Sequence, residues 1–146
     1  MPSENLERNA FVLLQRVAGH LLREVEEVLK PSHLSPSQYN VLRILRGGDP
    51  EGIPCRTIAE RMITRDPDMT RLLDRLEGRG LVTRTRLSSD RRVVRTRISD
   101  AGLVLLEGLD RPINDLHIRQ LSHVGQDNLE KLSELLTIAQ KSRETV

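Results

Sequence analysis

Residues 67–99 constrain the fold most, because the spacing of their apolar residues changes at Gly80. Before this glycine the apolar residues recur at intervals of three and four, which predicts an amphipathic helix: Met69, Leu72, Leu73 and Leu76. After it, two runs with period two, "LVTRTRL" and "VVRTRIS", flank the polar stretch 88–92. β-Branched residues on either side of a turn-forming segment predict a β-hairpin.

A shorter helix is expected just upstream, over about residues 54–62, with Ile58, Ala59 and Met62 facing inward. Asp66 is placed to cap the next helix, and Pro67 suits its first helical position. Two helices separated by a turn of a few residues form a helix-turn-helix. The hairpin that follows would then be the wing of a winged helix-turn-helix.

The rest of the chain is predicted to be helical. One long helix spans residues 6–30, and "LSPSQYNVLRIL" begins another at the cap Ser35. A third starts at Ser99 or Asp100 and is kinked at Pro112, and "SHVGQDN" separates it from a last helix. With aromatic residues at 1% of the chain, the core must be built from Leu, Ile, Val and Met. The predicted fold class is mainly α with a small β-hairpin wing.

Charge is distributed unevenly along the chain. Residues 54–97 carry a net charge of +6, whereas the remainder carries −4. A basic middle between acidic ends is typical of a nucleic-acid-binding module. Residues 67–99 contain nine arginines and no lysine, and planar guanidinium groups suit two-pronged contacts to guanine and phosphate. Two alternatives stay open: a mixed surface of local ion pairs, and solubilising charges on an edge hairpin.

Several other classes of protein are disfavoured. The single cysteine, Cys55, has no partner for an internal disulfide, which favours a reduced, cytoplasmic setting, and we predict no leader or membrane-spanning segment. Cys55 is interpreted as a small half-buried residue in preference to a reactive thiolate. The four histidines lack metal-ligand spacing, so no metal and no cofactor are expected. No Ser/His/Asp set or glycine-rich phosphate loop is present, so we predict that the protein is not an enzyme.

Four motifs occur in order: "LSPSQYNVLRIL", "IPCRTIAERM", "PDMTRLLDRLEGRGLVTR" and "SSDRRVVRTRISDAG". Through them, residues 6–140 resemble the MarR (multiple antibiotic resistance regulator) family of bacterial transcription regulators. The resemblance implies a single domain over residues 1–146, with a winged helix-turn-helix lobe at 35–99. It also implies a helical dimerisation region, formed by residues 6–30 and 101–143.

The family's DNA-binding roles carry over onto matching positions. The helix over residues 67–79 resembles the recognition helix, and the Asp90–Arg91 pair matches the wing motif in which the aspartate holds an arginine that reaches a minor groove. Arg84 is expected to pair with Asp90 or with a phosphate. The candidate DNA-binding residues are Thr70, Arg71, Arg75, Arg84, Arg86, Asp90, Arg91 and Arg92.

The resemblance also implies a function. We predict a sequence-specific, homodimeric transcription regulator, a repressor that binds a palindromic site in double-stranded DNA and that a small phenolic or other anionic effector releases. Effector candidates on the first two helices are Arg16, His20, Tyr39 and Arg43. The alternative is a winged-helix module that binds proteins and not DNA.

Overall fold

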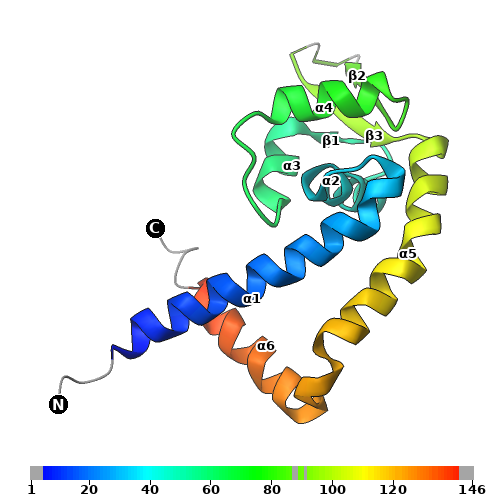
Figure 1. The fold of residues 1–146 in the computed structure, drawn as a ribbon. Coiled ribbons are helices and arrows are strands. Elements are labelled where there is room, and N and C mark those ends of the chain that lie inside the picture. The colour runs from blue at the N-terminus through cyan, green and yellow to red at the C-terminus, as the bar shows by residue number, and fades with distance from the viewer. Residues whose placement is uncertain (1–4, 87–88, 91, 142–146) are drawn as a thin grey trace. The chain divides into compact units, whose positions relative to one another are not determined.

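The structure is a computed structural model that describes residues 5–86, 89–90 and 92–141. The described residues form six α-helices, two short 3₁₀ helices and a small antiparallel sheet, which confirms the predicted fold class. Figure 1 labels the α-helices and the strands. Backbone contacts divide the chain into two compact units, one ending at Pro112 and the other beginning at Ile113. The units are described separately below.

The first unit opens with a long helix. Helix α1 (Leu6–Leu29) is capped by Asn5, whose side chain accepts a hydrogen bond from the backbone N–H of Arg8. It passes into a 3₁₀ turn, η1 (Lys30–Ser32), and then into α2 (Pro36–Arg46). The expected capping box of α2 is present, because Ser35 and Gln38 exchange hydrogen bonds between side chain and backbone.

Helices α3 (Cys55–Arg61) and α4 (Met69–Gly78) form the predicted helix-turn-helix. The predicted start of α4 was wrong: Asp68, not Asp66, is the N-cap, since its carboxylate accepts from the backbone N–H of Arg71 at 3.0 Å. The Asp66 carboxylate instead accepts from the backbone N–H of Asp68, which makes a tight turn before the cap. Pro67 therefore lies before the helix and not at its first position.

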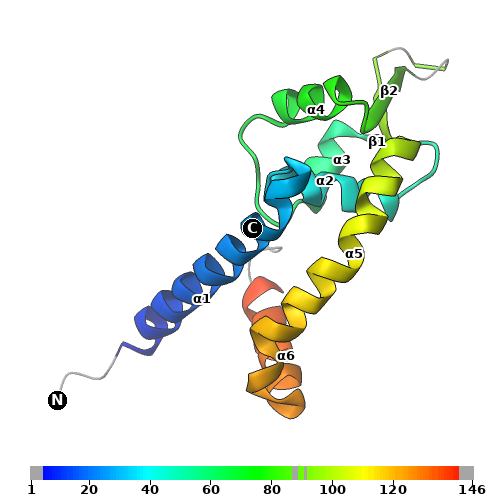
Figure 2. The same cartoon turned by 45° about the vertical axis from the view of Figure 1, so that its right-hand side comes forward.

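The hairpin is formed by β2 (Val82–Arg86) and β3 (Val94–Ile98), as predicted. The sequence analysis missed a third strand, β1 (Ile53–Pro54), which pairs with the outer side of β3 to give the order β1-β3-β2. Both pairings are antiparallel, and Thr96 of β3 lies opposite Ile53 on one side and Arg84 on the other. Figure 2 shows β2 next to α4, which it contacts.

The core of this unit is aliphatic, as the composition required. Helix α2 is its centre, in contact with α1, α3, α4 and β3. The buried apolar residues up to Pro112 are Leu29, Leu34, Tyr39, Val41, Leu42, Leu45, Ile53, Ile58, Met69, Leu72, Leu73, Leu76, Leu81, Val82, Leu106 and Leu109. The four apolar residues predicted to share the inner face of α4 are all among them.

The base of the hairpin is joined tightly to helix α5 (Asp100–Leu121). Ser99 caps this helix by accepting from the backbone N–H of Gly102, and its hydroxyl donates to the Gly80 carbonyl at 2.6 Å. Its own backbone N–H donates to the Leu81 carbonyl. A Cβ at Gly102 would collide with that same carbonyl and lie 2.7 Å from Cγ1 of Ile98. Only glycine lets α5 begin this close to the hairpin.

The second unit holds the rest of α5, the 3₁₀ turn η2 (Ser122–Val124) and α6 (Gln126–Lys141). Helix α5 continues through Pro112, where a kink was predicted, and the division between the units follows that residue directly. Ile113 and Leu116 are buried, whereas Leu135 and Ile138 of α6 are more than half exposed. None of the described helices combines the length and the apolar character needed to cross a membrane.

Candidate nucleic-acid interface

Helix α4 presents one apolar and one polar face. Its apolar side chains are buried in the first unit, so the residues between them point outward. Thr70, Arg71 and Arg75 are all exposed on this outward side, as the sequence predicted. The two arginines are four residues apart and therefore lie one above the other along the helix. They form a short basic row on the surface of α4.

The basic row borders a groove of about 620 Å³ between α4 and the N-terminal end of α2. The groove is lined by His33, Ser35, Ser37, Gln38, Asp66, Asp68, Arg71, Leu72 and Arg75. Ser37, Gln38 and His33 line this groove but were not predicted from the sequence as candidate DNA-binding residues. Their signal was the Ser-Pro-Ser-Gln run, because a helix begun by such a run presents backbone N–H groups and hydroxyls that suit an anion.

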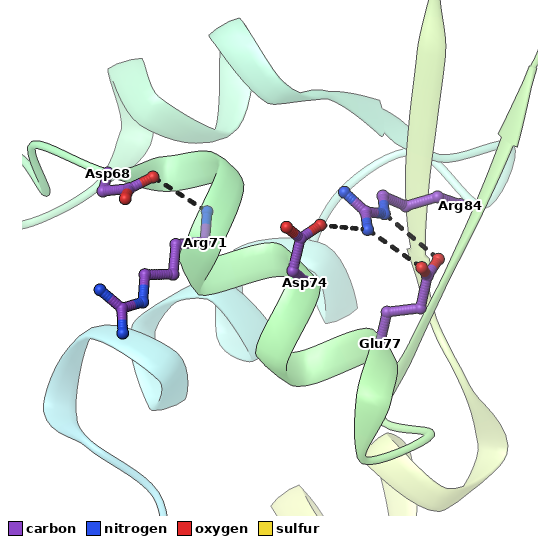
Figure 3. Close-up of polar contacts among 5 residues, drawn as sticks. All are labelled: Asp68, Arg71, Asp74, Glu77 and Arg84. Carbon is purple, nitrogen blue, oxygen red and sulfur yellow. Dashed lines mark hydrogen bonds and ion pairs between the residues drawn. The ribbon is translucent and has the colours of Figure 1, made fainter.

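Arg84 points from β2 onto α4 and does not pair with Asp90, which corrects one of the two predicted partners. Figure 3 shows its guanidinium between two carboxylates of the helix. Its Nε donates to Glu77 at 3.2 Å, and Nη2 donates to Glu77 at 3.0 Å and also to Asp74. The hydrogen bond from Arg84 lowers the pKa of the Glu77 carboxyl, and the bonds to Glu77 and Asp74 raise the pKa of the guanidinium.

This network ties the wing to the candidate recognition helix. The Arg84 side chain is 23% exposed and the carboxylates are about half exposed, so solvent screens the pairs and their main effect is geometric. Arg71 lies on the same helix but extends away from the network in Figure 3. Arg84 therefore pairs with carboxylates of the protein, whereas Arg71 stays outside this network. Both had been predicted as DNA-binding residues.

The strand register puts the four strand arginines on two faces of the hairpin. Arg84 lies opposite Thr96, and Thr85 lies opposite Arg95, so Arg84 and Arg86 share one face and Arg95 and Arg97 share the other. Arg95 turns back toward the loop before β1, where Nη1 lies 3.4 Å from the Gly52 carbonyl and 3.9 Å from the Asp49 carboxylate. The two rows of arginine thus do not form one continuous surface.

The tip of the hairpin is organised by Asp90. Its carboxylate accepts from the backbone N–H of Arg92 at 3.0 Å, and its carbonyl accepts from that of Val93. Arg86, Asp90 and Arg92 are exposed. Arg91, the predicted partner of Asp90, lies outside the described residues. The role of the Asp90–Arg91 pair therefore stays a prediction.

Three of the four effector candidates make contacts on their own helices. Arg43 stacks over the Tyr39 ring at 5.9 Å, and its charge partly offsets the burial that raises the pKa of that phenol. His20 Nδ1 lies 2.8 Å from Nη2 of Arg23. Arg16 is exposed. A separate cavity of about 250 Å³ is lined by Leu22, Glu26, Pro36, Ser37, Asn40, Met62, Ile63 and Thr64. None of the four candidates lines it, so the effector site stays a prediction.

The described residues contain no group of three histidine, cysteine or acidic side chains that could hold a metal ion. Cys55, at the start of α3, is a free, half-buried thiol. A basic row on an outward helix face, a groove beside it and a hairpin tied to the same helix define a winged helix-turn-helix protein of the DNA-binding kind.

Comparison with known proteins identifies the family. Residues 34–94 match the sequence profile of the MarR family. A MarR transcription factor from Planctomyces limnophilus is 42% identical in sequence, with 94% of this chain and 98% of that chain covered and a TM-score of 0.70. The chain belongs to the MarR family and is a transcription regulator.

Two further relatives bear on ligand binding and on the sign of regulation. CouR from Rhodococcus jostii RHA1, solved bound to p-coumaroyl-CoA, is 30% identical, with 92% of this chain and 93% of that chain covered and a TM-score of 0.78. The HTH-type transcriptional repressor IacR of Pseudomonas putida is 26% identical over 136 residues, which cover 93% of this chain and 80% of IacR.

Proposed function

We propose that the protein is a homodimeric repressor that binds a palindromic operator, acts in the cytoplasm and has no enzymatic activity of its own. The observation that carries the proposal is the exposed row of Arg71 and Arg75 on α4. This row borders the groove between α4 and the N-terminal end of α2. In a helix-turn-helix the second helix enters the major groove of DNA, and the first helix crosses the DNA backbone.

In this arrangement each residue has a distinct task. Thr70, Arg71 and Arg75 face base edges and the flanking phosphates, and Arg86 and Arg92 supply positive charge along the wing. Asp90 shapes the tip through its bond to the backbone of Arg92. Arg84 takes part indirectly, by fixing the angle between wing and helix through Asp74 and Glu77. Asp66 and Asp68 repel phosphate, so that end of α4 lies toward the base edges.

The dimer is supported by apolar side chains that the protomer leaves uncovered. α1 carries several large ones, and large exposed apolar surfaces on soluble proteins often mark interaction sites. The exposed apolar residues of α1 and α6 are Leu6, Phe11, Leu13, Leu14, Val17, Leu22, Leu132, Leu135, Leu136 and Ile138. A twofold dimer through these helices would present two copies of α4, which matches a palindromic site.

A small phenolic or other anionic effector is proposed by analogy with CouR, which was solved with the phenolic thioester p-coumaroyl-CoA. The repressing role is supported by the relation to IacR. A ligand that binds one arrangement of the dimer more tightly than the other would shift the protein away from the DNA-binding arrangement.

The test of the DNA-binding assignment compares Arg71→Ala with Arg92→Ala. Arg71→Ala should relax preference at one base pair in each half-site, since a base-edge arginine contributes about 1–3 kcal/mol of discrimination. Arg92→Ala should weaken binding to specific and random duplexes alike and reduce the log–log salt slope by about one unit.

The measurement is titration of duplexes selected from a random pool, and of base-pair variants of them, at several salt concentrations. Arg8→Ala on α1 is the control and should bind like the wild type. If wild type selects no sequence and Arg71→Ala changes nothing, the protein-binding alternative takes over. That alternative has no specific support here, because a protein-binding wing has no need of the basic row on α4.

A further inference from the structure

Arg79, directly after α4, makes contacts that neither the charge pattern nor the proposed DNA interface explains. Its Nη1 donates to the carbonyl of His33 at 2.7 Å, and its Nη2 donates to the carbonyl of Ser32 at 2.9 Å. The guanidinium fork therefore spans two neighbouring backbone carbonyls that lie more than forty residues earlier in the chain. These carbonyls end the 3₁₀ turn η1, which follows α1 without a break.

The acceptors are well matched to a cation. The last carbonyls of a helix lack partners inside the helix and carry partial negative charge. His33 is also the one non-glycine residue with a positive φ, +52°, among the residues described. A left-handed residue of this kind costs energy and persists where its surroundings hold it. Arg79 supplies such a hold, because it binds the carbonyl of the strained residue itself.

The clamped turn belongs to the candidate DNA interface. His33 lines the groove between α2 and α4 together with Arg71 and Arg75. The Arg79 fork thus connects the C-terminal end of α4 to the wall of the groove that α4 borders. It also connects α4 to the end of α1, the helix with the largest set of exposed apolar side chains.

We infer that Arg79 is a positioning residue: it fixes the angle at which α4 is presented to DNA by tying it to the turn that ends α1. The effect on DNA rests on the proposed function, whereas the clamp itself does not.

Arg79→Lys and Arg79→Ala test the inference against direct phosphate contact. Lysine keeps the charge but cannot spread two donors across two carbonyls. Both variants should lose about tenfold in affinity for the duplex that the wild type selects, which is the size of one charge-assisted hydrogen bond. The loss should be the same at every salt concentration, with the log–log slope unchanged. In the free proteins, backbone amides of residues 30–35 should exchange with solvent faster than in the wild type.

Arg46→Lys is the matched control. Arg46 also forms a fork, to the Asp110 carboxylate at 2.8 Å for both bonds, but it does not line the groove. This variant should be less stable and should bind DNA like the wild type. An equal loss of affinity in Arg46→Lys would overturn the inference, because the loss would then reflect general destabilisation.

Two other results would also overturn it. Wild-type affinity in Arg79→Lys, together with a slope reduced by about one unit in Arg79→Ala, would identify a phosphate contact. Unchanged amide exchange in residues 30–35 would show that no clamp acts in solution. If the wild type binds no DNA at all, the proposed function fails, but the exchange experiment still decides whether the clamp exists.

Discussion

Gly102 is a position at which one added methyl group should be destabilising, because it would meet backbone. In Gly102→Ala the new Cβ would collide with the Leu81 carbonyl oxygen and lie 2.7 Å from Cγ1 of Ile98. The oxygen belongs to backbone that is already engaged, because it accepts from the Ser99 N–H at 3.0 Å. It therefore cannot move aside as the end of a long side chain could. The start of α5 must shift away from the hairpin, or the hairpin must shift away from α4.

The magnitude follows from two opposing effects. Forcing an extra carbon into a packed site costs about 1–3 kcal/mol, and a backbone neighbour places this case toward the upper end. Replacing glycine by alanine in a helix returns less than about 1 kcal/mol, and less still in the first turn. We expect the free energy of unfolding to fall by about 2 kcal/mol, or the melting temperature by roughly 5 °C for a chain of this length.

The assay is urea unfolding at a fixed protein concentration, since dimerisation would make the midpoint concentration-dependent. Gly78→Ala is the control: it adds the same methyl group in α4, where nothing lies within 4 Å, and should be neutral or stabilise by about 0.5 kcal/mol. Equal stability of Gly102→Ala and wild type would refute the argument from close approach.

Two other substitutions test single features. The Thr96 hydroxyl is buried and finds no hydrogen-bond partner among the described residues, so Thr96→Val should raise the free energy of unfolding by about 1 kcal/mol, and the exposed Thr85→Val should change it less; a lower value for Thr96→Val would mean that the hydroxyl is bonded. Leu135→Glu should yield monomer in sedimentation experiments while Lys131→Glu stays dimeric, and a folded Leu135→Glu dimer would contradict the proposed interface.

The parts of the fold that depend on local chemistry could be predicted from the sequence. Apolar spacing located α1, α2 and α4, and the Ser35–Gln38 capping box fixed the start of α2 to the residue. The change in the spacing of apolar residues at Gly80 located the start of the hairpin. Gly80 itself, between α4 and β2, has a φ of +71°. In each case the signal and the structure it specifies lie within a few residues of each other.

Features decided by distant partners could not be predicted. Strand β1 is two residues long and exists because Ile53 lies opposite Thr96, which follows it by more than forty positions. The cap of α4 was predicted at Asp66, whereas Asp68 caps the helix, and local sequence does not separate the two because either carboxylate can cap a helix. In the structure the Asp66 carboxylate shapes the turn and the Asp68 carboxylate caps the helix.

The sequence predicted which arginines lie on α4 and on the hairpin. It did not predict which of them pair within the protein and which face outward. The resemblance to the family implied Asp90 or a phosphate as the partner of Arg84, whereas the packing of β2 on α4 brings Asp74 and Glu77 to it. Nothing in the alternating pattern separates such an arginine from an outward one, because both occupy polar positions. The distinction needs the register of the hairpin and the face of α4 that the core covers.

The absence of lysine from residues 67–99 can now be attributed to structure as well as to recognition. Arg84 spans two carboxylates and Arg79 spans two carbonyls. Each task needs donors spread over a plane, which a guanidinium provides and an ammonium does not. Part of the basic charge of this segment thus joins wing, recognition helix and neighbouring turns. Arg71 and Arg75, on the outward face of α4, take no part in these forks and are the arginines that we propose to contact DNA.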